Sequence, residues 1–200
     1  MRRSSIYIYI AVALMLVLYV FPWLVNPSAS LSPNAYDLAE WASLHPLVHA
    51  QTPALLTPLL LRLPLACLAL LIAFSTQRRN LISALIVIVL AVALLPPELI
   101  LPTSDPNSQQ MQLLAAITLV GGLIGVSGIL PRLRAWIAVA VALIGAAAGA
   151  LGVAQSYALM RGFNLPMQIG MGGVALTIAF VLVAGTLAVS RYQKGQPKLP

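Results

Sequence analysis

The stretch PALLTPLLLRLPLACLALLIAF, residues 53–74, decides the fold of this chain. It has the length of a membrane-spanning helix, which needs about 20 apolar residues, and its interior carries one charge, Arg62. The surrounding sequence is of the same kind, with 60% hydrophobic and 8% charged residues, whereas soluble domains carry about 25% charged residues. The composition therefore predicts an all-α integral membrane protein embedded in the lipid bilayer.

Apolar runs and their polar connectors predict a single multipass domain over residues 1–200. The first run is longer than a signal-peptide core, so we expect it to be an uncleaved helix. Pro58 and Pro64 should disturb the first half of the second span. The six predicted transmembrane helices cover residues 6–25, 53–74, 81–95, 111–130, 135–154 and 169–190, with an outer loop at 26–52 and a basic tail at 191–200.

The distribution of charge predicts the orientation. The net charge is +7. All the basic residues except Arg62 and Arg161 lie in the N-terminal segment, the C-terminal segment or the connectors that the predicted spans place on the same side of the membrane. Because basic residues mark cytoplasmic segments, we expect both termini in the cytoplasm and the chain in the cell membrane. Nucleic-acid binding is not expected, since no basic stripe is interleaved with aromatic residues. The four acids all fall on the outer side: Asp37, Glu40, Glu98 and Asp105.

The outer loop at 26–52 should contain a short interfacial helix. Ser32-Pro33 is typical of a helix start, and Pro46 of a helix end, so the helix is predicted over about residues 33–44. Its apolar side should lie on the membrane surface, and this predicted face consists of Tyr36, Leu38, Trp41 and Leu44.

Arg62 is a candidate functional residue, because a charge inside a membrane span is costly and needs a partner. The acids on the same side, Glu40, Asp37 and Glu98, are the predicted partners. In the favoured interpretation Arg62 holds the outer loop on the bundle. The alternative is that it binds an anionic lipid head group or a quinone-like carbonyl.

His45 and His49 are four residues apart, a spacing that on one helix could present a metal, haem or chlorin ligand pair. Pro46 interrupts that helix, and no further cysteine or histidine is nearby. We therefore expect no cofactor and no metal, with a haem, chlorin or metal at this pair as the alternative.

Small residues are spaced four apart in the last three predicted spans. The pairs Gly121/Gly125 and Gly145/Gly149 are typical of close helix contacts in lipid. We expect the spans at 111–130, 135–154 and 169–190 to pack on each other, or else to receive a helix of another subunit.

The spans contain no Asp, Glu, Lys or His, and the chain has no nucleotide-binding loop or recognisable catalytic set. His45 with Asp37 or Glu40 is the one candidate acid–base pair of an enzyme acting on lipids or quinones. We therefore predict a non-catalytic membrane subunit that stabilises a larger respiratory, photosynthetic or transport-related complex. Its partners would touch Arg62, Glu40, Asp37, Trp41 and the glycine faces. The alternative function is a small permease or channel-like component for a lipophilic substrate.

Overall fold

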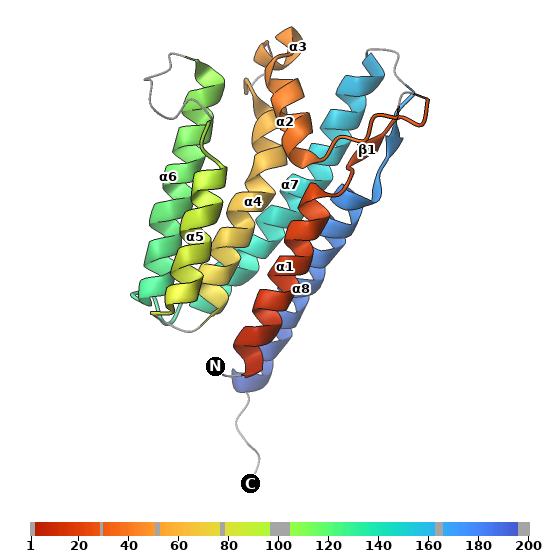
Figure 1. Cartoon of the computed structure of the whole chain (residues 1–200). Helices are drawn as coiled ribbons and strands as arrows, with labels where there is room; N and C mark the ends of the chain where they lie inside the picture. The colour runs from red at the N-terminus through yellow and green to blue at the C-terminus, as the bar shows by residue number, and fades with distance from the viewer. Residues whose placement is uncertain are drawn as a thin grey trace.

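The computed structural model describes residues 3–28, 30–50, 53–76, 79–96, 105–162 and 166–195. Helix α4 (Leu56–Ser75) lies at the centre, where it packs against α1 (Arg3–Val20), α5 (Leu81–Ala93), α6 (Pro106–Ser127) and α7 (Arg134–Gly162) (Figure 1). Its most apolar window is 78% buried, against 28–50% for the equivalent windows of α6, α7 and α8 (Met171–Gly195). The stretch at 53–74 thus forms the core of the fold.

Four of the described helices, α4, α6, α7 and α8, are long and apolar enough to cross a membrane. The apolar part of α1, Ile6–Val20, and α5 are shorter. With 13 residues, α5 is about 20 Å long, less than the roughly 30 Å hydrocarbon core. The chain is therefore a nearly all-α protein with membrane-length helices, and the structure does not by itself show six crossings.

The first helix ends at Val20, five residues before the end predicted from hydropathy. Pro22 lies two residues further on, and Leu24–Val25 then form strand β1, which pairs antiparallel with β2 (Gln168–Ile169). Trp23 is fully buried at the start of α8, edge-on to Tyr19. A long-range backbone pairing therefore replaces the last turn of the predicted helix and the first residues of the predicted span at 169–190.

Other helix boundaries also differ from the prediction. Helix α4 begins at Leu56 rather than 53, and it contains Pro64 without interruption. Helix α6 begins at Pro106 rather than 111, because Asp105 caps it and proline suits the first helical position. Helix α7 continues eight residues past 154, with its polar Gln155 accepting a hydrogen bond from Thr57.

The glycines lie at contacts within the chain. A methyl group placed on Gly125 would lie 2.8 Å from Ala73 of α4, and one on Gly145 would lie 2.6 Å from the Phe180 ring of α8. Gly121 and Gly149 similarly face Leu70 and Thr177. The expected mutual packing of the last three spans holds for α7 with α8, but α6 packs on α4 and α5 instead.

The bundle has two chemically different ends (Figure 1). We call the end that carries α2 (Ala35–Ser43), α3 (Pro46–His49) and Asp105 the acidic end. The opposite end, near both termini, carries Arg79, Arg132, Arg134 and Arg191, and we call it the basic end.

Candidate functional site

The Arg62 cluster consists of Arg62 on α4, Glu40 on α2 and Asn107 on α6. Arg62 is 1% exposed, and its guanidinium donates from Nη2 to Glu40 Oε1 at 2.7 Å and from Nη1 to Asn107 Oδ1 at 2.6 Å. A buried charge is stable only when it is paired and hydrogen-bonded, so these contacts permit arginine at this depth. The cluster joins three helices that are distant in sequence.

Of the three acids named as partners of Arg62, the structure places Glu40 in contact with it. Asp37 has another role, and Glu98 lies outside the described residues. Asn107 was not among the predicted partners, because hydropathy placed it in a loop. The sequence signal that could have found it is Asp105-Pro106, which starts α6 early enough to bring Asn107 onto the helix.

Local capping positions Glu40. The side chain of Asn34 accepts hydrogen bonds from the backbone N–H groups of Tyr36 and Asp37, and Asp37 accepts one from the Asn34 backbone. This capping box starts α2 at Ala35, two residues after the predicted Ser32-Pro33 start. Asp37 therefore stabilises the helix that carries Glu40.

The face of α2 that packs on the bundle consists of small and aliphatic side chains, which include Ala35, Leu38 and Ala39, and α2 packs chiefly against α4. Of the residues predicted to face the membrane surface, Leu38 is thus buried within the chain, whereas Trp41 and Leu44 are 53% and 81% exposed. Close contact with α4 requires small residues, so the larger side chains are left on the open side.

In the halves of α1, α4 and α6 nearest the acidic end, three buried polar atoms of the described residues have no hydrogen-bond partner. They are Tyr19 Oη, Arg62 Nε and Gln110 Oε1. Buried polar atoms are usually satisfied, often by ordered water. The surroundings of Arg62 therefore have spare capacity for water or for a hydroxyl or carbonyl group. The cluster's own acid, Glu40, is already ion-paired, which suits a positioning role better than proton transfer.

The two histidines do not share a helix face. His45 is the N-cap of α3, with its Nδ1 accepting from the Leu47 backbone at 3.1 Å. His49 ends that helix, and its Nε2 donates to the Ser43 carbonyl at 2.7 Å. Proline after His45 starts a new helix, so the alternative in which both histidines lie on one face of a single helix is not realised. Among the described residues, no group of three or more His, Cys, Asp or Glu side chains is placed to hold a metal ion.

Asp105 stabilises the start of α6 close to this region. Its carboxylate accepts hydrogen bonds from the backbone N–H and the hydroxyl of Ser108. The backbone bond from Ser108 is the main reason that the pKa of Asp105 lies below its usual range, and the charge of His49 contributes less.

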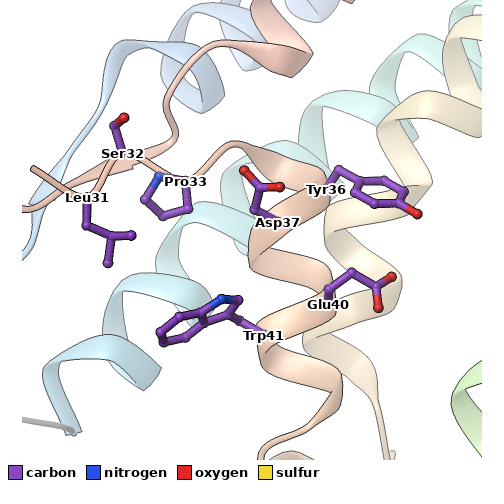
Figure 2. A pocket seen from close by; sticks show the side chains of 7 residues that line it. All are labelled: Leu31, Ser32, Pro33, Tyr36, Asp37, Glu40 and Trp41. Carbon is purple, nitrogen blue, oxygen red and sulfur yellow. The ribbon is translucent and has the colours of Figure 1, made fainter.

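Trp41 separates two open grooves at the acidic end. One groove, of about 410 Å³, lies between α2 and residues 31–33. Figure 2 shows Tyr36 and Glu40 pointing from α2 toward α4, whereas Trp41 points the other way, toward Leu31. The other groove, of about 400 Å³, lies between Trp41, His45 and the end of α7 at Leu159. Trp41, Leu44 and Leu47 are large exposed apolar side chains close together in the chain, and these three residues are called the ridge below.

In comparisons with protein-family models, curated proteins and solved structures, nothing matched this chain, so its function is inferred from its own geometry.

Proposed function

We propose that this protein is a non-catalytic integral membrane subunit that packs against and stabilises a larger membrane complex, respiratory, photosynthetic or transport-related. The observation that carries the proposal is the ridge, held in place by the Arg62 cluster. Large exposed apolar surfaces that lie outside membrane-length helices mark interaction sites.

The ridge is suited to binding because it is rigidly supported. Glu40 and Trp41 are adjacent on α2, so the ion pair to Arg62 fixes the helix turn that carries the exposed tryptophan. Trp41 is 53%, Leu44 81% and Leu47 65% exposed within seven residues of chain. Tryptophan is enriched among the residues that dominate interface energies, and a preordered surface loses little entropy on binding.

The glycines face other helices of this chain, which leaves fewer surfaces for partner contacts than the sequence alone suggests. Gly121, Gly125, Gly145 and Gly149 meet side chains of this chain. A partner helix packing on α6 or α8 would therefore meet their large exposed aliphatic side chains, such as Ile117 and Leu182. We assign the specific partner contact to the ridge and the less specific contacts to these aliphatic faces.

The proposed topology has six crossings, with both termini in the cytoplasm and the basic end on the cytoplasmic side of the cell membrane. The gathering of arginines at the end that holds both termini supports this orientation. Single cysteines at Ala50, an exposed residue of the acidic end outside the ridge, and at Leu81, in a Cys67→Ser background, test it with a membrane-impermeant maleimide. Ala50→Cys should be labelled on intact cells and Leu81→Cys only after permeabilisation, and the reverse pattern would contradict the orientation.

A photo-crosslinking amino acid at the ridge tests the proposed function. Leu44 at the acidic end is the test position, and Leu81 at the basic end is its matched control, at 81% and 82% exposed respectively. In native membranes, position 44 should give one discrete protein adduct, which should disappear when Trp41 is also replaced by alanine. Position 81 should give none. Equal yields at both positions, or no adduct at 44, would refute the assignment of the ridge.

A second function, a small permease for a lipophilic substrate, is favoured by a groove between α1 and α5. It has a volume of about 520 Å³ and an almost wholly apolar lining that includes Val12, Leu16, Ile86 and Val89. Uptake of a fluorescent lipophilic probe into proteoliposomes separates the two functions. Saturable uptake that is lost in Val12→Trp would favour the permease, and uptake equal to that of empty liposomes would favour the subunit.

A further inference from the structure

A second polar pocket lies at the basic end, remote from the Arg62 cluster. It is an open pocket of about 320 Å³ between the end of α4, the start of α7 and the last turns of α8. Its polar lining includes Ser75, Arg134 and Arg191, and its apolar lining includes Ala138 and Leu187. The pocket is thus amphipathic, with positive charge and hydroxyl groups on one part and methyl-bearing side chains on the other.

Arg134 is built into the wall of this pocket. It is 8% exposed, and its Nη2 donates to the carbonyls of Ala73 at 2.9 Å and Thr76 at 2.7 Å, while its Nη1 donates to the carbonyl of Gly125. These contacts tie the start of α7 to the C-terminal ends of α4 and α6. The guanidinium is therefore held in one position, and its charge is a fixed feature of the pocket.

Two other groups in the lining have donor capacity. Arg191 is partly exposed, and its Nη2 donates a long hydrogen bond, 3.3 Å, to the Arg132 carbonyl. Ser75 Oγ is buried without a hydrogen-bond partner among the described residues. A buried hydroxyl is usually hydrogen-bonded, so its position in the pocket lining points to a ligand atom that accepts a bond from it.

The electrostatic field at this end of the described structure is positive. The described acids, Asp37, Glu40 and Asp105, all belong to the acidic end. Basic pockets between membrane helices suit anionic lipid head groups, and arginine binds phosphate through charge-assisted, often bidentate, hydrogen bonds.

From these observations we infer that the pocket binds the phosphate group of an anionic phospholipid. Arg191 and Ser75 donate to the phosphate oxygens, and the fixed charge of Arg134 attracts them. An acyl chain of the same lipid then lies along Ala138 and Leu187. A soluble phosphate ester shares the phosphate chemistry, but it would leave the apolar part of the lining uncovered.

Native mass spectrometry of the purified full chain in mild detergent tests this inference with two probes, phosphatidylglycerol and phosphatidylcholine. The wild type should retain the anionic lipid preferentially. Arg191→Gln should lower that retention by about tenfold or more, the loss expected for one charge-assisted hydrogen bond, and Ser75→Ala should lower it less. Arg161→Gln is the matched control, because Arg161 is exposed near the opposite end of α7 and stacks over Tyr157 at 5.8 Å.

Unchanged elution and thermal stability in lipid-free detergent will show that Arg191→Gln is folded. Equal retention of the two lipids by the wild type would overturn the inference, and so would normal phosphatidylglycerol retention in Arg191→Gln. Displacement of the lipid by excess inorganic phosphate, with the same dependence on Arg191, would overturn the lipid as the natural source of the phosphate.

Discussion

The ion pair between Arg62 and Glu40 is asymmetric, and this predicts which partner is more costly to lose. The side chain of Arg62 is 2% exposed, whereas that of Glu40 is 40% exposed. Replacing Glu40 by alanine leaves a cation buried among apolar side chains, with Asn107 as its remaining acceptor. Replacing Arg62 by methionine leaves a carboxylate that water already reaches.

The expected free energies follow from this difference. Removing one partner of a buried ion pair costs about 3–5 kcal/mol, and the Asn107 contact should hold Glu40→Ala near 3 kcal/mol. Arg62→Met should cost about 1 kcal/mol, because it loses hydrogen bonds but keeps much of the aliphatic packing. The double variant should resemble Arg62→Met alone, which gives a coupling energy of about 3 kcal/mol.

Reversible unfolding in mixed micelles, followed by circular dichroism, measures these values, and limited proteolysis of residues 31–50 reports whether the α2–α3 segment is loosened. Arg161→Met serves as the control for loss of an arginine at the same end and should change neither readout. If Arg62→Met costs more than Glu40→Ala, or if the two costs simply add, the ion pair does not hold α2 on α4 in the way proposed. A variant that assembles normally but loses an activity would instead assign Arg62 a chemical role.

Two further predictions concern packing and capping. Gly145→Ala should destabilise the fold by about 1–3 kcal/mol, because the added methyl group meets the fully buried Phe180 ring, whereas Gly185→Ala, with nothing within 4 Å, should be neutral or stabilising in the same unfolding assay. Asp105→Ala should cost about 1 kcal/mol at neutral pH through loss of the α6 cap. Since the folded-state pKa of Asp105 is lowered, its contribution is complete above its unfolded pKa of about 3.9 and is lost as pH falls through the lower folded value. Unfolding curves measured from pH 7 downward should therefore converge for wild type and Asp105→Ala, and a constant gap would contradict the role of the carboxylate.

The sequence predicted which segments are helical, but it placed several helix ends wrongly. Hydropathy locates apolar runs because lipid requires them. It does not show that Leu24 and Val25 leave the first helix, because their pairing with residues 168–169 comes from the other end of the chain. Hydropathy also ends the predicted span before α7 ends, because Gln155 is polar. In the fold, the side chain of Gln155 accepts a hydrogen bond from Thr57.

The candidate site was predictable in part. A charge inside a span requires a partner, and topology reduced the choice to acids on one side. The capping box of α2, which fixes the angular position of Glu40, then decides between Asp37 and Glu40. Glycine spacing likewise predicted close contacts but not the neighbour, because such spacing is a property of one helix, whereas the partner depends on tertiary packing.

The most direct test of the proposed subunit function is the native mass of the chain after gentle extraction from its own membrane. A membrane subunit should be recovered as a discrete species much heavier than the 21.1 kDa chain, containing at least one other protein and lost when Trp41 and Leu44 are replaced by polar residues. A chain that is extracted under the same conditions as a monomer with lipid alone would contradict it.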